Sequence, residues 1–225
     1  MKKLLTSITL IFWFLGLKAQ TGIQVLYTNP DMPEWENILP NQKNNVTVAV
    51  DYWFRLKNIR IEFLPEISLG SYNFNAINSV NSFNKVKTDH LGFHFNTNFY
   101  IFDLAGDCDC PTFSKEGNSL KKGFFIQLGP GISYFSHTLT DENVINVESN
   151  TFGISIQGGV GIDIGISDFL TITPLFKIRY APQTEGKGYT AIIAPNDTGN
   201  FDKTSVTTYN FGIRLGLHWD ELNRF

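Results

Sequence analysis

The chain has 225 residues, of which 14% are aromatic and 17% are charged, with two cysteines and a formal net charge of −3. This length favours a single domain, and the nearly balanced charge argues against nucleic acid as a partner. No apolar run reaches the roughly 18 to 20 residues of a membrane-spanning helix, so such a helix is not expected.

The first residues have the features of a secretory signal peptide. Lys2 and Lys3 precede an apolar run over residues 4–17, and Ala19 supplies a small residue before Gln20. We therefore predict a cleaved signal peptide over residues 1–19 and one mature domain over residues 20–225. The alternative, an uncleaved anchor helix, is disfavoured because the apolar run is too short.

The next part of the chain alternates short strands with a polar connection. Residues 23–28 are a short first strand, and residues 29–45 contain three prolines and several asparagines that indicate a loop. Residues 46–54 place valines and aromatic residues at every second position, as in a strand with one apolar face. A tight link leads to residues 59–70, where isoleucines face outward and two glutamates and an arginine face inward.

The same alternation returns in the middle of the chain. Residues 75–88 are rich in Asn, Ser and Lys and indicate a second long loop, after which residues 91–102 alternate phenylalanine with polar side chains. Residues 104–122 interrupt the pattern, and residues 124–135 form a further strand. Residues 138–150 are polar and indicate another loop.

The longest alternation lies in residues 152–166, where isoleucine, valine and phenylalanine share one face and glycine, serine, glutamine and aspartate share the other. A short return leads to a strand over residues 170–180. Residues 182–204 indicate a long loop, and the last strand is predicted over residues 209–219.

Eight alternating segments predict an all-β, antiparallel, eight-stranded up-and-down transmembrane β-barrel. The segments suit strands that cross a bilayer at a tilt, and only a closed barrel satisfies strand backbones inside lipid. Long loops then follow strands one, three, five and seven, as is usual on the outer side of such barrels. The long connection over residues 104–122 falls on the inner side, so either it is a genuine excursion there or the strand count is wrong by one.

These residues resemble the small outer-membrane barrels of the OmpA and OmpX type within the porin-like barrel families. The resemblance covers the whole mature chain and includes Phe225, which is similar to the family's C-terminal assembly signal, although residues 220–225 lack the outward apolar alternation. It implies an outer-membrane location, contact with outer-membrane lipid, insertion by the barrel-assembly machinery and an unknown surface ligand bound through the long loops.

The inward positions predict an ion network in the lumen. Four acids and four bases share this face: Asp51, Arg60, Glu62, Glu66, Asp163, Lys177, Arg179 and Arg214. Inward amides complete their hydrogen bonds: Asn96, Asn98, Gln127, Gln157 and Asn210. Because unpaired buried charges are costly, this balance predicts mutually paired groups that plug the barrel.

Other candidate chemistry is weak. Cys108 and Cys110 could form a disulfide, remain two free thiols, or act as a redox pair or half of a metal site. His94, His137 and His218 face inward together with Ser133, but no spacing identifies a catalytic triad. The glycine-rich residues 158–161 do not precede a helix, so phosphate binding is not expected. We therefore predict no enzyme, no cofactor and no metal site.

Four functions remain open at this level. The first is a barrel with a structural or surface-interaction role carried by its loops. The second is a narrow pore or transporter, and the third is a lipid-modifying outer-membrane enzyme. The fourth is a soluble lipocalin-like barrel, which would turn its apolar face inward.

Overall fold

The computed structural model describes nine segments of the chain, namely residues 20–35, 41–42, 45–56, 59–77, 83–104, 119–140, 146–167, 169–185 and 202–218. The predicted signal peptide, Cys108, Cys110 and the last residues with Phe225 lie outside the described residues. Their predicted roles therefore stay predictions.

Strands make up nearly all of the described part. The elements in chain order are β1 (Gln20–Asp31), η1 (Pro33–Trp35), β2 (Asn41–Gln42), β3 (Asn45–Arg55), β4 (Ile61–Ile77), β5 (Phe83–Phe99), α2 (Ser119–Gly123), β6 (Phe124–Thr140), β7 (Asn146–Ile162), β8 (Ile164–Ser167), β9 (Leu170–Glu185) and β10 (Lys203–His218). No helix among the described residues is both long and apolar enough to cross a membrane.

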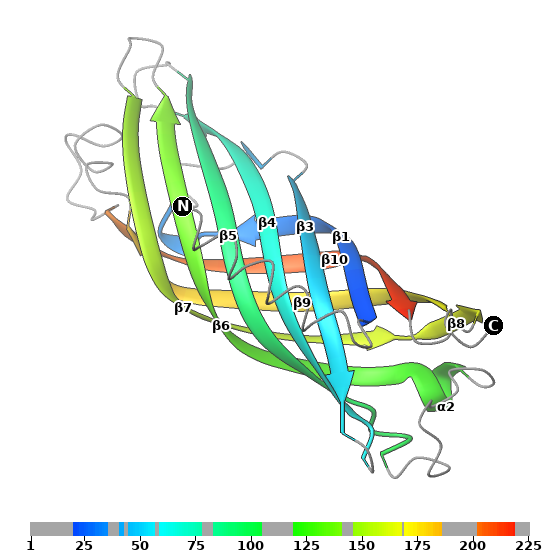
Figure 1. Ribbon diagram of the computed structural model, residues 1–225. Coiled ribbons are helices and arrows are strands. Elements are labelled where there is room, and N and C mark those ends of the chain that lie inside the picture. The colour runs from blue at the N-terminus through cyan, green and yellow to red at the C-terminus, as the bar shows by residue number, and fades with distance from the viewer. Residues whose placement is uncertain are drawn as a thin grey trace, which may run out of the picture.

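The strands close into a barrel (Figure 1). Neighbouring strands follow the order β10, β1, β3, β4, β5, β6, β7, β9, and β9 pairs again with β10 to complete the circle. All of these pairings are antiparallel, and β7 and β8 both pair with β9 as one strand interrupted at Asp163. The prediction of an eight-stranded antiparallel barrel is confirmed.

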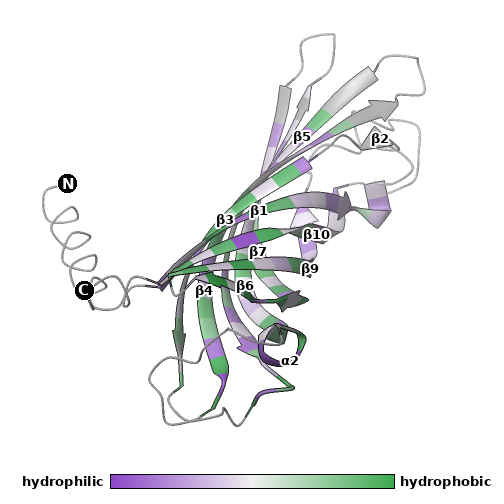
Figure 2. Ribbon diagram, turned by 90° about the vertical axis from the view of Figure 1, so that its right-hand side faces the viewer, coloured by the Kyte–Doolittle hydropathy of each residue, from purple (hydrophilic) through white to green (hydrophobic). Residues whose placement is uncertain are grey.

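The alternation in the sequence becomes the two faces of the wall. On β7, the outward Ile154 is 76% exposed, whereas the inward Gln157 is 1% exposed. Hydrophobic and hydrophilic residues alternate along the same ribbons in Figure 2. The outer surface of the barrel is therefore apolar, and its interior is mainly polar, which is the reverse of a lipocalin.

The outward apolar band has a similar length on strands from different parts of the wall. It runs from Leu91 to Phe99 on β5 and from Leu170 to Tyr180 on β9, close to the roughly 9 to 11 residues of a tilted transmembrane strand. Tyrosines form part of one edge of the band, where Tyr27, Tyr134 and Tyr180 are exposed. Aromatic residues at the edges of an apolar band are typical of membrane interfaces.

Two predicted loops are shorter than the sequence indicated. Residues 75–88 and 138–150 were expected to be loops, but β4 and β5 remain paired up to Ile77 and Phe83, and β6 and β7 up to Thr140 and Asn146. Figure 1 shows β4 to β7 rising as long ribbons above β1, β9 and β10. The prediction of long loops at these two places was wrong.

The reason is a change of polarity along these strands. Beyond the apolar band the outward residues are polar, including Asn73, Lys87 and Glu148, while Tyr72 and Phe135 are buried inside. Polar outward positions suit a strand surrounded by water. Polar composition alone therefore indicated a loop where the strands continue.

The long connection between β5 and β6 is a genuine feature of the inner end, and the strand count was correct. The backbone N–H of Arg60, in the link between β3 and β4, donates to the carbonyl of Leu104 at 3.1 Å. The N–H of Tyr100 donates to the carbonyl of Arg60 at 3.4 Å. Both connections thus meet at the same end of the barrel.

Candidate functional site

The polar interior of the barrel is the candidate functional site. All eight charged residues predicted to face inward are buried there: Asp51, Arg60, Glu62, Glu66, Asp163, Lys177, Arg179 and Arg214. Each residue lies in a strand or directly beside one, so the pleat of the strand sets the direction of its side chain.

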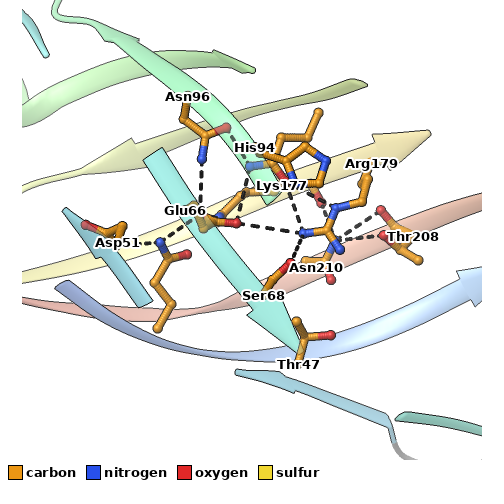
Figure 3. A network of polar contacts seen from close by, with 12 residues as sticks. Thr47, Asp51, Glu66, Ser68, His94, Asn96, Lys177, Arg179, Thr208 and Asn210 are labelled. Atoms are coloured by element: carbon orange, nitrogen blue, oxygen red, sulfur yellow. Dashed lines mark hydrogen bonds and ion pairs between the residues drawn. The ribbon is translucent and has the colours of Figure 1, made fainter. Parts of the chain in front are cut away.

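Glu66 of β4 is the centre of the network (Figure 3). Its Oε2 accepts a hydrogen bond from Lys177 Nζ on β9 at 2.5 Å, and Oε1 lies 3.8 Å from Arg179 Nη2. Side-chain amides of Gln24 and Asn96 also donate to Oε2, at 2.9 and 3.1 Å. A single carboxylate thereby connects strands on opposite sides of the lumen.

A second ion pair lies beside this centre. Arg214 of β10 holds Asp51 of β3 with two nitrogens, Nε at 2.9 Å from Oδ2 and Nη2 at 2.6 Å from Oδ1. Such a forked contact fixes the orientation of both groups. Gln24 donates to Asp51 Oδ2 at 2.7 Å as well as to Glu66, so its amide joins the two ion pairs.

The inner end of the lumen brings Arg60, Glu62 and Asp163 together with residues outside the predicted ion network. Arg60 forms its ion pair with Asp103, which lies in the connection after β5 and was not among the predicted residues. Glu62 and Asp163 both lie at hydrogen-bond distance from the Tyr100 hydroxyl, at 2.7 and 2.6 Å. Asp103 was missed because it follows a strand, where alternation no longer predicts direction.

The predicted amides do complete hydrogen bonds in the interior. Gln127 donates to Asn98 at 2.7 Å, and Gln157 donates to Asn96 at 2.6 Å. Asn210 accepts from the Thr28 hydroxyl at 2.8 Å. Gln24, which the sequence analysis did not select, could have been found from its position between the outward Ile23 and Val25.

Serines and histidines form a cluster nearer the outer end. Arg179 joins this cluster to the Glu66 network, because its Nη1 lies 3.2 Å from His90 Nδ1. Ser133 contacts His90 at 3.3 Å and donates to Ser155 at 2.8 Å, and Ser155 contacts His94 at 2.9 Å. His137 instead contacts Thr88 at 2.9 Å. All of these side chains are buried, so a lipid in the surrounding membrane has no contact with them. His90 was missed because it preceded the predicted start of its strand, and the side chain of His218 lies outside the described residues.

The short helix η1 covers the outer mouth. Trp35 is 2% exposed and its ring meets the ring of His137 edge to face, with centroids 5.1 Å apart. Glu34 anchors the helix to β10 because its carboxylate accepts hydrogen bonds from Thr204 Oγ1 at 2.6 Å and from the Ser205 N–H at 3.0 Å. We call residues 33–35 the cap.

The anchor predicts that the cap loosens in acid. Burial alone would raise the pKa of Glu34, but hydrogen bonds from Thr204 and Ser205 outweigh it and hold the pKa below its ordinary value of 4.5. The stabilising charge is therefore present above pH 4.5 and is lost as the pH falls through the lowered pKa. The emission of Trp35, isolated as the difference between wild type and Trp35→Phe, should shift to the red in that range.

Glu34→Gln is the matched control for this experiment, because it keeps the size of the side chain and removes its titration. Its Trp35 emission should not change in the same pH range. A wild-type signal that stays constant down to the pH at which the barrel itself unfolds would contradict the role of Glu34.

Inward glycines make room for the large side chains of the lumen. The ring of Phe125 occupies the space that a side chain on Gly161 would need, and Asn96 does so at Gly129. Gly22 lies against the Arg214 and Asp51 pair: an added Cβ would be 2.5 Å from Arg214 Nε and 2.6 Å from both carboxylate oxygens of Asp51. The narrow lumen is thus filled by pairing small residues with large ones.

Gly22→Ala is therefore expected to destabilise the barrel by about 1 to 3 kcal/mol, because the added methyl group pushes the two charged partners apart. Gly153→Ala is a suitable control, since its nearest neighbour would be the Gln183 carbonyl at 3.5 Å. Urea titration of both variants in detergent measures the difference. Equal stability of the two variants would show that the ion pair can shift without lowering the free energy of unfolding.

No group of three or more His, Cys, Asp or Glu side chains suited to a metal ion occurs in the described segments. No protein-family model and no curated protein sequence matches this chain.

Solved structures with a similar fold include Neisserial surface protein A, at 8% identity over 89% of this chain and 96% of that protein, with a TM-score of 0.46. Ail, the attachment invasion locus protein of Yersinia pestis, matches at 8% identity over 89% of this chain and 98% of its own, with a TM-score of 0.47. A major outer membrane protein from Thermus thermophilus matches at 10% identity over 88% of this chain and 100% of that protein, with a TM-score of 0.42. These likenesses concern the fold alone.

Proposed function

We propose that this protein is a small outer-membrane barrel with a closed lumen, which acts at the cell surface through the connections at its outer end. The observation that carries the proposal is the apolar band around the closed wall. A surface of this kind is unfavourable in water and matches a bilayer in height. The predicted signal peptide would direct the chain across the inner membrane and be cleaved near Gln20.

Closure of the lumen is supported at three levels. At the inner end Arg60 pairs with Asp103. In the middle Glu66 holds Lys177 from the opposite wall, and Asp51 holds Arg214 from the second strand along the wall. At the outer mouth Trp35 of the cap is buried. Eight strands leave an interior only wide enough for side chains, which favours a closed barrel over a pore.

A surface role is supported by the outer extension of the barrel. The paired strands that continue beyond the apolar band have polar outward residues and a core that includes Tyr72, Phe74 and Phe135. This core stiffens the ends of the hairpins. Rigid strand ends suit the presentation of binding connections, as in other folds in which loops on a scaffold carry function.

The test uses the purified, detergent-solubilised protein. Unheated and boiled samples should migrate differently on a gel, because a closed barrel stays compact until it is heated. In planar bilayers the wild-type protein should give no stable single-channel conductance, because the network and the cap close the lumen. An unheated sample that migrates like the boiled sample would contradict a closed, compact barrel in detergent.

The conductance experiment also separates the closed barrel from the pore. Trp35→Ala should leave the protein closed, because the Glu66 and Asp51 pairs lie below the cap. Stable wild-type conductance that is unaffected by substitutions at Glu66 and Arg214 would contradict the closed lumen and favour a transporter.

A further inference from the structure

A small cavity lies in the middle of the polar interior. Gln24 of β1 and Gln127 of β6 line it from opposite walls, together with Asn98, Lys177 and Arg214. Apolar residues complete the lining: Leu64, Phe125, Val160, Leu175 and Phe176. The volume open to the centre of a water molecule is about 10 Å³. This is room for about one water molecule.

Two buried acceptors on the lining residues have no hydrogen-bond donor from the protein. They are Gln24 Oε1 and Gln127 Oε1, in side chains that are 1% and 5% exposed. The orientation of Gln24 is fixed, because its Nε2 donates to both Asp51 and Glu66, and a turned amide would direct Oε1 at two carboxylates. An unpaired buried acceptor is costly, so a donor is expected in the cavity.

The charges of the lining select the kind of occupant. Lys177 and Arg214 would repel a metal cation, and the two unpaired glutamine oxygens would repel an anion. Lys177 and Arg214 are already matched by Glu66 and Asp51, so a charged occupant would also upset a balanced interior. A small neutral group that both donates and accepts hydrogen bonds suits the polar side chains of the lining.

We propose that this cavity is a binding site for one ordered water molecule. The water donates its two hydrogens to Gln24 Oε1 and Gln127 Oε1 and accepts a hydrogen bond from Lys177 or Arg214. It thereby completes the polar network between opposite walls. A water with three such partners is typical of buried sites in proteins.

A high-resolution crystal structure of the wild-type protein tests this inference. We expect one density peak within hydrogen-bond distance of both glutamine oxygens. The peak should be lost in Gln127→Leu, which keeps the approximate volume without an acceptor, and kept in Ser149→Ala near the outer end. If Gln127→Leu fails to fold, the wild-type crystals alone decide.

Two results would overturn the inference. One is a well-ordered wild-type cavity without density between the two glutamine oxygens. The other is an anomalous peak at this position in crystals soaked in bromide or rubidium salts, which would identify an ion site. Neither result depends on whether the barrel conducts, so the inference stands apart from the proposed function.

Discussion

Replacing Glu66 with alanine is expected to destabilise the barrel by about 3 to 5 kcal/mol, because it leaves buried cations without their anion. Glu66 is 0% exposed, and Lys177 Nζ lies 2.5 Å from it. Arg179 would lose the same partner. The network also loses the acceptor for Gln24 and Asn96, so several polar groups are left unsatisfied by one substitution.

The measurement is a urea titration of the folded protein in detergent. Its readout is the ratio of compact to unfolded protein, taken from the two bands on unheated gels. Glu66→Gln should cost less than Glu66→Ala, since the amide oxygen can still accept hydrogen bonds. Lys87→Ala is the control for an ion pair at the surface, because both side chains are about half exposed and Lys87 Nζ lies 2.7 Å from Asp89 Oδ2. Such surface pairs contribute about 0 to 1 kcal/mol. A Glu66→Ala variant as stable as Lys87→Ala would contradict the central role of this carboxylate.

Replacing Arg214 with alanine is expected to cost about 3 to 5 kcal/mol, because the Asp51 carboxylate stays buried without its charge partner. Gln24 still donates to Asp51, but a single amide does not balance a full negative charge. Arg214→Lys should recover only part of the loss, since an ammonium group cannot reproduce the forked contact through Nε and Nη2.

The same urea titration compares these two variants with Lys187→Ala, for which almost no effect is expected. Lys187 lies outside the described residues, in the part of the predicted outer loop between the end of β9 and the start of β10. Equal stability of Arg214→Lys and wild type would show that charge alone, without the fork, is sufficient. Equal stability of Arg214→Ala and wild type would show that Asp51 is neutral or solvated in the folded barrel.

The sequence determined the wall of the barrel because side-chain direction in a strand is local. Outward Ile67 and Leu69 alternate with inward Glu66 and Ser68, and the chain repeats this alternation often enough to require a closed sheet. The inward position of each predicted charged residue follows from the same rule. The polar ends of β4 to β7 were misjudged because a strand in water and a loop have similar composition.

Only the tertiary structure decided which inward groups meet. Glu66 and Lys177 are 111 positions apart, and Asp51 and Arg214 are 163 apart. Their contacts depend on strand order, tilt and register around the closed circle, which alternation along one strand does not contain. Arg60 meets Asp103, and Trp35 meets His137, because connections fold back over the ends of the barrel. Direction is set by the local pleat, whereas pairing across the lumen is set by closure of the whole wall.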